Sequence, residues 1–277
     1  MFIKGKKIVH IGDINCGSKE LFLIAGPCVI EEDDIMLRTA DMLKRIQEKL
    51  KIPIIYKSSF SKDNRTKIGS YTGPGLDAGL KILERIKKDF SFPVLTDIHY
   101  PYQALPVSQV CDVIQIPAFL CMQTELLAAA AKTKKAINIK KGQFIPAESM
   151  IHPINKCKAF GNDDIMISER GFVMGYGDLV VDPRSLHFLN ETLHPVIFDV
   201  THSIRKLGIP SENQGYTYKK LLPVIARAGV AAGIDGLFIE THPESSKAKC
   251  DSITQINTDL LEDLLKPLLD IHNIINK

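Results

Sequence analysis

The sequence predicts an α/β fold, a closed (β/α)8 TIM barrel with a short N-terminal β-hairpin. Short apolar runs alternate with amphipathic helical patterns along the chain, which is typical of a parallel sheet covered by helices. Eight such strand–helix units follow one another, the number that closes this barrel. No linker-like stretch divides the chain, so residues 1–277 are predicted to form one domain. An open doubly wound sheet is the alternative, and a count of eight suits it less well.

Residues 1–20 are predicted to form a hairpin that caps the barrel, because they hold two short apolar stretches, Phe2-Ile3 and residues 8–11. The barrel strands are predicted where continuous apolar runs occur, as expected of strands that helices cover. These strands are residues 21–25, 53–57, 93–97, 112–116, 136–140, 164–169, 195–200 and 236–240.

Each strand is followed by a predicted helix. The first begins at the acidic residues 31–34, which favour a helix N-terminus, and continues with apolar residues at helical spacing. Pro74 marks the start of the second, and Pro267 predicts a bend in the last. The helices are expected near residues 31–50, 75–89, 101–110, 122–132, 147–160, 183–192, 217–232 and 257–275.

The composition is that of an ordinary globular protein, with 45% hydrophobic and 24% charged residues. A net charge of +3 gives no indication of a nucleic-acid or membrane partner, and no stretch approaches the length of a membrane span. The six cysteines have no CxxC spacing, which favours free thiols in a reducing compartment. We therefore expect a cytoplasmic protein.

The ends of the predicted strands all carry a polar or metal-competent side chain. In (β/α)8 barrels the active site lies at the carboxyl ends of the strands, and a barrel used only as a scaffold would not need these groups. In chain order they are Cys28, Lys57, Asp97, Gln115, Lys140, Arg170, His202 and Glu240.

The loop after the second strand is rich in cations and hydroxyl groups, and it predicts an anion-binding site. A solvated basic loop is the alternative for this stretch alone. Together with the cations at other strand ends, the charge exceeds what one small anion requires, so two phosphorylated substrates, or one with two anionic ends, are expected. Lys140 and Arg170 can close on one phosphate, while Arg65, with Asn64 and Thr66, can hold another.

A second set of side chains predicts a metal site. Cys28, His202, Glu240 and Asp251 offer a thiolate, an imidazole and two carboxylates, which suit a divalent ion such as zinc, iron or manganese. A single Cys or His is more often a structural residue, and it is their combination at one end of the barrel that favours the metal. His242, two residues after Glu240 on the same strand, is a competing ligand.

Ten motifs, in register from about residue 21 to the C-terminus, resemble those of the 3-deoxy-D-manno-octulosonate 8-phosphate synthases. They are AGPC (25–28), YKSSF (56–60), KDNRT (62–66), GPGL (73–76), LTDIH (95–99), IQIPAFL (114–120), NIKKGQF (138–144), ERG (169–171), FDVTHS (198–203) and FIETHP (238–243). The resemblance implies condensation of phosphoenolpyruvate with D-arabinose 5-phosphate and water, on the route to lipopolysaccharide. It also implies a homotetramer of (β/α)8 barrels.

The resemblance also implies a role for each matching residue. The catalytic residues would be Lys57, Lys62, Asp97 and His202. The substrate-binding residues would be Ser59, Asn64, Arg65, Thr66, Gln115, Lys140 and Arg170. The metal ligands would be Cys28, His202, Glu240 and Asp251. An Asn replaces Cys28 in the metal-independent branch of the family, so Cys28 predicts metal dependence.

Two departures from the family pattern bear on the acceptor sugar. Met122 stands where an Arg is usual, and residues 204–215 lack the usual Gln-Leu/Met-Pro-Gly pattern. A sister family that uses erythrose 4-phosphate resembles Lys-Pro-Arg-Thr/Ser in the second loop, so Asn64 favours arabinose 5-phosphate. The alternatives are an erythrose 4-phosphate acceptor, a Schiff-base aldolase that uses Lys140, and a barrel that binds sugar phosphate without turnover.

Overall fold

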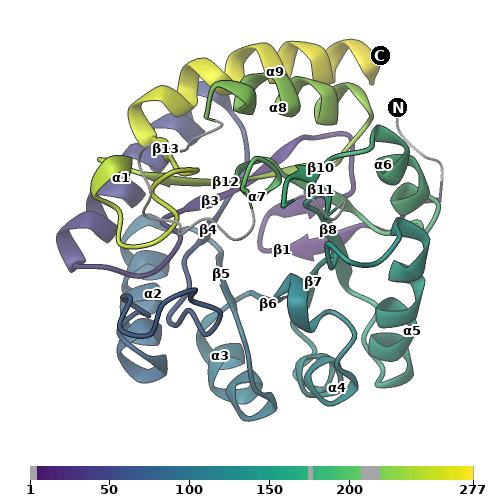
Figure 1. The fold of residues 1–277 in the computed structure, drawn as a ribbon, viewed down its shortest axis with the longest axis horizontal. Coiled ribbons are helices and arrows are strands. Elements are labelled where there is room, and N and C mark those ends of the chain that lie inside the picture. The colour runs from purple at the N-terminus through teal and green to yellow at the C-terminus, as the bar shows by residue number, and fades with distance from the viewer. Residues whose placement is uncertain (1–4, 174–176, 207–218, 277) are drawn as a thin grey trace.

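Eight parallel strands close into a barrel in the computed structural model, which describes residues 5–173, 177–206 and 219–276 (Figure 1). The barrel strands are β3 (Phe22–Gly26), β4 (Ile54–Lys57), β5 (Val94–Asp97), β6 (Val113–Ile116), β7 (Ala136–Lys140), β8 (Ile165–Glu169), β11 (Val196–Asp199) and β12 (Gly236–His242). Each strand pairs with the next, and β12 pairs with both β3 and β11, which closes the sheet. The predicted barrel is therefore confirmed, and the open sheet is wrong.

Helices surround the barrel, as Figure 1 shows. They are α1 (Asp33–Leu50), α2 (Leu76–Phe90), α3 (Ala104–Val110), α4 (Thr124–Lys132), α5 (Ile151–Ala159), α6 (Pro183–Asn190), α7 (Val200–Ser203), α8 (Leu222–Ala231) and α9 (Leu261–Ile275). In α1 the buried side chains include Met36, Ala40 and Leu43, at the spacing that predicted the helix. No helix within the described ranges is long and apolar enough to cross a membrane.

Several predicted helices begin one turn too early, because a 3₁₀ turn precedes the α-helix. These turns are η1 (Pro101–Gln103), η3 (Ala147–Met150), η4 (Lys219–Leu221) and η6 (Thr258–Leu260). Two further 3₁₀ turns, η2 (Ala118–Leu120) and η5 (Ser245–Lys247), do not lead directly into a helix. The short helix α7 was not predicted at all, and it follows β11 directly. Pro267 lies inside α9, which the structure assigns as one helix.

The N-terminal hairpin consists of β1 (Val9–Ile11) and β2 (Ile14–Cys16), which pair in antiparallel register. The predicted hairpin is confirmed: Val9–Ile11 pairs with Ile14–Cys16, and Phe2-Ile3, the other apolar stretch, lies outside the described residues. Both strands point one face inward, and these side chains pack against apolar residues inside the barrel such as Phe22 and Phe238. The hairpin therefore closes the barrel on its amino-terminal side.

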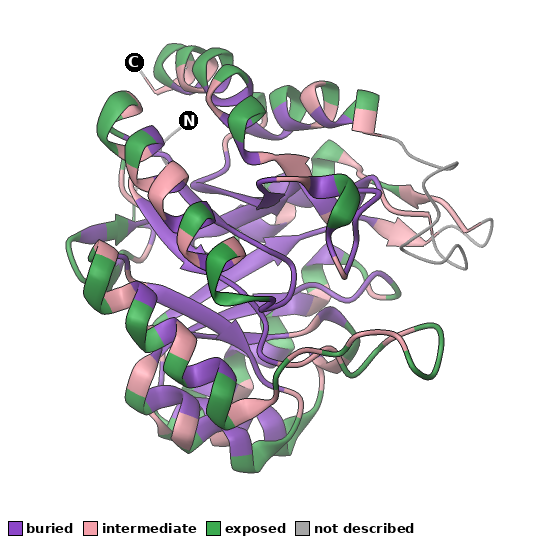
Figure 2. Ribbon diagram, turned by 90° about the vertical axis from the view of Figure 1, so that its left-hand side faces the viewer, coloured by how far each residue is buried: buried purple, intermediate pink, exposed green. Residues whose placement is uncertain are grey.

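Further short strands lie in the loops at the carboxyl ends of the barrel strands. An antiparallel pair, β9 (Phe172–Val173) and β10 (Leu179–Val180), follows β8, and β13 (Ile256–Asn257) pairs with β12. Figure 2 shows the buried strands at the centre of the molecule and the exposed faces on the surrounding helices. At the carboxyl end many buried strand residues are polar, including Lys57, Gln115 and Lys140. The carboxyl end of the barrel is therefore a candidate binding or catalytic site and not part of the apolar core.

Candidate active site

A pocket of about 260 Å³ opens at the carboxyl ends of the barrel strands. The structure brings most of the predicted site residues to its walls. Those that line it are Lys57, Lys62, Asn64, Arg65, Thr66, Asp97, Gln115, Lys140, Arg170, His202 and Asp251. The remaining three, Cys28, Ser59 and Glu240, are buried and each contacts a lining residue.

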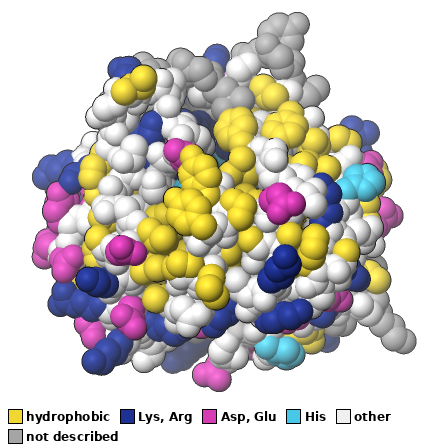
Figure 3. Space-filling view, turned by 90° about the horizontal axis from the view of Figure 1, so that it is seen from below, with side chains coloured by type: hydrophobic (Ala, Val, Ile, Leu, Met, Phe, Trp, Pro, Cys, Tyr) yellow, Lys and Arg dark blue, Asp and Glu magenta, His cyan; other side chains and the backbone are white. Residues whose placement is uncertain are grey.

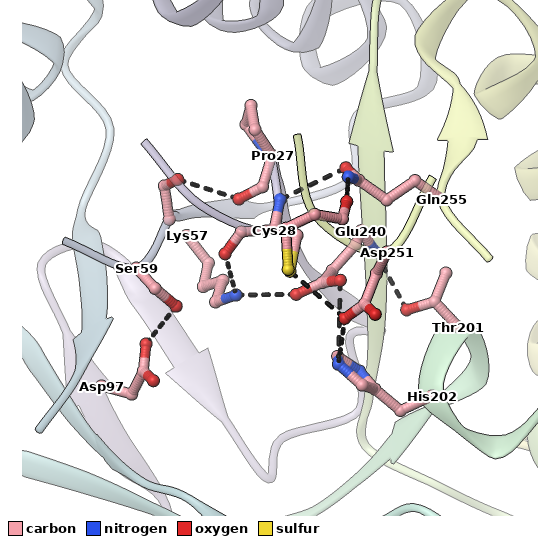
Figure 4. Close-up of polar contacts among 12 residues, drawn as sticks. Pro27, Cys28, Lys57, Ser59, Asp97, Thr201, His202, Glu240, Asp251 and Gln255 are labelled. Atoms are coloured by element: carbon pink, nitrogen blue, oxygen red, sulfur yellow. Dashed lines mark hydrogen bonds and ion pairs between the residues drawn. The ribbon is translucent and has the colours of Figure 1, made fainter. Parts of the chain in front are cut away.

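The four predicted metal ligands meet around Asp251 (Figure 4). Its Oδ2 lies 3.4 Å from Cys28 Sγ and 3.7 Å from His202 Nε2. His202 Nε2 also lies 3.7 Å from Glu240 Oε2, and ligand atoms of His202, Glu240 and Asp251 all lie within 4.8 Å of one another. Cys28 follows β3, His202 lies in α7, Glu240 lies in β12 and Asp251 lies in the loop after β12.

This acidic cluster has unused hydrogen-bonding capacity. Glu240 Oε2 and Asp251 Oδ1 are buried and have no hydrogen-bond partner within the described part of the chain. Burial raises the pKa of both carboxyl groups, but nearby cations outweigh it: Lys57 and Lys62 lower the pKa of Glu240, and Arg205 and Lys62 lower that of Asp251 well below its usual value. Both are therefore ionised at neutral pH, and oxygen atoms in this state suit a cation.

The thiol and imidazole of this cluster are neutral at pH 7. Burial, with the neighbouring Cys250 and Glu240, raises the pKa of the Cys28 thiol well above its usual value. Burial lowers the pKa of His202 below its usual value, although Asp199 and Glu240 act against the shift. Neutral imidazole is the form that binds metal ions. Cys250 Sγ lies 3.1 Å from Cys28 Sγ and was not among the predicted site residues.

His242 lies outside this cluster. Its Nδ1 accepts a hydrogen bond from the backbone N–H of Glu244 at 2.9 Å, and its Nε2 lies 3.6 Å from Glu31 Oε2. The two groupings of metal-competent side chains among the described residues do not include it. The structure therefore favours Glu240 over His242 as the ligand from β12.

Two buried lysines pair with carboxylates that lie two strands away in the sheet. Lys57 Nζ lies 2.7 Å from Glu240 Oε1 and donates to the carbonyl oxygen of Cys28 at 3.0 Å. Lys140 Nζ forms an ion pair with Asp199. Asp199 also lies 2.8 Å from Nδ1 of His202. Sequence reasoning missed Asp199, although it is the last residue of β11, because His202 was taken as the group at that strand end.

Lys62 and Asp97 lie on the same wall. Burial lowers the pKa of Lys62, but the carboxylates of Asp97 and Glu240 outweigh it, and that pKa is raised well above its usual value. Asp97 accepts a hydrogen bond from Ser59, and its Oδ2 lies 3.3 Å from His99 Nε2. His99 lines the pocket and was quoted only as part of a motif, so its place there is a finding of the structure.

The predicted cations of the two anion-binding sets enter the pocket from different parts of the barrel. Arg170 follows β8, next to β7, which carries Lys140, and its Nη1 donates to Gln143 Oε1 at 3.1 Å. Arg65, in the loop after β4, donates from Nη1 to Cys250 Sγ at 2.9 Å. Since β4 lies three strands from β7 in the sheet order, the two sets face one pocket from separate sides.

Met122 and residues 204–206 are the described part of the two departures from the family pattern. Met122 is partly buried, and its carbonyl oxygen accepts a hydrogen bond from Lys156 at 2.7 Å. Of residues 204–215 only 204–206 lie in the described part, and there Arg205 Nη1 lies 3.4 Å from Asp251 Oδ1. Arg205 is a further lining residue that the sequence did not single out.

A comparison with known proteins identifies the family. The sequence model of the DAHP synthetase I family matches residues 3–277, nearly the whole chain. The chain belongs to the DAHP synthetase I family. The family resemblance predicted from the sequence is thereby confirmed.

Three curated relatives of this chain share one protein name. A 2-dehydro-3-deoxyphosphooctonate aldolase of Legionella pneumophila (strain Corby) is 48% identical over 261 residues, which cover 94% of each chain. The enzyme of that name from Pseudomonas putida (strain GB-1) is 42% identical over 271 residues, 98% of this chain and 96% of the relative. That of Azotobacter vinelandii (strain DJ) is 41% identical over 273 residues, covering 98% and 97%.

Proposed function

We propose that this chain is a 3-deoxy-D-manno-octulosonate 8-phosphate synthase, the enzyme that its relatives' name, 2-dehydro-3-deoxyphosphooctonate aldolase, also denotes. It would condense phosphoenolpyruvate with D-arabinose 5-phosphate and water, release inorganic phosphate, and serve lipopolysaccharide synthesis. The observation that carries the proposal is one pocket that cations enter from two separate sides. The two substrates each bring one phosphate, so each set of cations can bind one of them. The full-length similarity to these relatives supports the same reaction.

The cations divide between the two substrates. Lys140 and Arg170 bind the phosphate of phosphoenolpyruvate, since an arginine fork and a lysine point charge together match phosphate oxygens. Its carboxylate lies towards Lys57 and Ser59. Arg65, with Asn64 and Thr66, binds the phosphate of the sugar at the opposite side of the pocket.

The reaction forms a bond from C3 of phosphoenolpyruvate to the aldehyde carbon of the sugar. Lys62, whose raised pKa keeps it protonated, donates to the aldehyde oxygen as that oxygen gains negative charge. Water adds at C2, and the bond from C2 to the phosphate oxygen breaks. Of the two protons that the water loses, one leaves with the phosphate and the other replaces the proton that passes from Lys62 to the aldehyde oxygen. The fixed carboxylates of Asp97 and Glu240 stabilise the positive charge that develops at C2.

We also propose that a divalent ion (zinc, iron or manganese) is held by Cys28, His202, Glu240 and Asp251. The buried Glu240 Oε2, which has no hydrogen-bond partner in the described part of the chain, supports it, because such an atom is costly unless a cation or a donor satisfies it. When bound, the ion supplies Lewis-acid chemistry that polarises an oxygen of the aldehyde or of water.

Calorimetry tests the metal proposal. The thiol of Cys28 is protonated in the metal-free protein, so binding is expected to release about one proton. Zinc titrations in buffers of different ionisation enthalpy measure that release, and a Cys28→Ser variant is the matched control. Binding without proton release would exclude the Cys28 thiolate from the ligand set.

A homotetramer is proposed from the family resemblance, and an apolar face of the molecule supports contact between copies of the chain. Figure 3 shows hydrophobic side chains gathered on one face, the side on which α3 and α4 lie in Figure 1. Exposed apolar residues of this region include Tyr102, Leu105 and Phe119, and Phe119 also lines the pocket. Apolar patches of this kind mark protein interfaces.

The six cysteines are free thiols, which supports a reducing, cytoplasmic location.

The release of phosphate from phosphoenolpyruvate, followed with each candidate acceptor, tests the reaction. We expect release with arabinose 5-phosphate and little with erythrose 4-phosphate, and mass spectrometry should identify the eight-carbon product. Release only with erythrose 4-phosphate would show that the chain has the activity of the sister family, which uses that four-carbon sugar. Permanent inactivation by borohydride in the presence of substrate would favour a Schiff base on Lys140, and tight sugar binding without release would favour a barrel that no longer turns over.

A further inference from the structure

Gln255 is a fully buried amide that lies behind the acidic cluster and does not line the pocket. Its Oε1 accepts a hydrogen bond from the backbone N–H of Cys28 at 3.2 Å. Its Nε2 donates to the carbonyl oxygen of Cys250 at 2.7 Å, and Figure 4 shows the contact of Gln255 with Cys28. One side chain thus joins the segment after β3 to the loop after β12.

The chemistry of this bridge requires an amide. One end of the side chain faces a donor and the other faces an acceptor, and only a carboxamide of this length satisfies both. A methionine would satisfy neither, and a glutamate would place an oxygen against the carbonyl oxygen of Cys250. Buried backbone N–H and C=O groups need partners, so Gln255 also satisfies two groups that would otherwise be unpaired.

The two joined segments carry two of the proposed metal ligands. Cys28 and Asp251 are 223 positions apart in the chain, and their ligand atoms lie 3.4 Å apart. Asp251 has a left-handed backbone conformation, with φ of 48°, which a residue other than glycine adopts at a cost. Its carbonyl oxygen accepts from the backbone N–H of Gln255 and of Thr254, both at 3.0 Å, so the residue that bridges to Cys28 also supports this conformation.

We infer that Gln255 is a positioning residue that sets the separation of Cys28 and Asp251 for the divalent ion. The inference rests on the proposed metal site, and Gln255 itself makes no bond to the ion. Residues that orient metal ligands through hydrogen bonds usually change metal affinity by about 10–100-fold when they are replaced. The side chain of Gln255 acts here through two backbone groups, one beside each ligand.

Asn162 offers a matched control. It is also a buried amide that bridges two backbone segments, donating to the carbonyl oxygen of Lys135 and accepting from the N–H of Asp164, both at 2.9 Å. These segments precede β7 and β8, so the bridge lies at the amino ends of the strands, away from the pocket. Asn162→Leu therefore removes a comparable bridge without touching the metal ligands.

The experiment compares zinc affinity of wild-type protein, Gln255→Met and Asn162→Leu by equilibrium dialysis, each checked for folding by circular dichroism. We expect Gln255→Met to bind zinc about 10–100-fold more weakly and Asn162→Leu to bind as wild type does. Wild-type affinity in folded Gln255→Met would overturn the inference, as would an equal loss in both variants. Should Gln255→Met not fold, Gln255→Glu, which keeps the acceptor for Cys28 and loses the donor to Cys250, replaces it with the same expectation.

Alkylation of metal-free protein by iodoacetamide, mapped by mass spectrometry, separates this inference from the metal proposal. Cys28 is fully buried, and we expect its alkylation to be faster in Gln255→Met than in wild type or Asn162→Leu. If wild-type protein binds no zinc, the metal proposal fails, and faster alkylation of Cys28 still supports positioning by Gln255. Equal alkylation rates in all three proteins would overturn positioning, whatever the metal result.

Discussion

The buried pair of Lys57 and Glu240 offers a quantitative test of how the site is held together. Their side chains are 2% and 0% exposed, and Nζ lies 2.7 Å from Oε1. At an effective dielectric constant of about 20 the attraction is about 6 kcal/mol, and the cost of burying both charges offsets much of it. Lys57→Met leaves the Glu240 carboxylate buried without its partner, and we expect it to lower the free energy of unfolding by about 3–5 kcal/mol.

A double-mutant cycle measures the interaction in metal-free protein by urea unfolding at neutral pH. The variants are Lys57→Met, Glu240→Gln and the double variant. Because the double variant leaves no unpaired charge, its loss should be smaller than the sum of the single losses by about 2–3 kcal/mol. Additive losses, or single losses below about 1 kcal/mol, would refute the claim that this ion pair organises the site.

Three further predictions concern substrate binding, acid stability and assembly. Arg170→Lys removes the planar fork that matches phosphate, so initial-rate kinetics should show the KM for phosphoenolpyruvate raised about 10-fold; an unchanged KM would place the phosphate elsewhere. Partial burial raises the pKa of Asp163, but hydrogen bonds from His194 and two lysines outweigh it and lower that pKa to about 2. The stability that this carboxylate contributes is present above pH about 4 and is lost as the pH falls towards 2. Asp163→Asn has no such carboxylate, so its free energy of unfolding should fall by about 1 kcal/mol less than that of wild type over this pH range. This value allows for the 39% exposure of the Asp163 side chain. A pH profile parallel to that of wild type would contradict the assignment. Leu105→Asp with Phe119→Asp places charge on the apolar face, and if the chain forms the proposed tetramer, light scattering should show that the double variant does not; a tetramer that persists in the variant would place the interface elsewhere.

Much of the fold could be predicted because the barrel strands are continuous apolar runs. Their predicted and observed ends agree to within one or two residues, and polar groups at those ends located the pocket. The errors lie where local pattern is weak. Strand β2 alternates buried Ile14 and Cys16 with an exposed Asn15 over only three residues, too short for a periodic signal. Helix α7 spans four residues and begins where the apolar run of β11 ends, so its start had no separate signal.

The site residues that sequence reasoning missed depend on contacts between distant segments. Asp199 had a usable signal, since it is a carboxylate at the end of an apolar strand. Gln255 had none, because one of its partners is 227 positions away in the chain and its neighbours describe an ordinary polar loop. Arg205 belongs to a loop that departs from the family pattern, so the resemblance offered no role for it.

The most direct measurement is phosphate release from phosphoenolpyruvate with arabinose 5-phosphate as acceptor, made before chelation, after chelation and after a divalent ion is restored. We predict release that requires the five-carbon sugar, disappears with the chelator and returns with zinc, iron or manganese. An equal rate of phosphate release before and after chelation would support the condensation but contradict the proposed role of Cys28, His202, Glu240 and Asp251. No release with this sugar under any of the three conditions would contradict the proposed function itself.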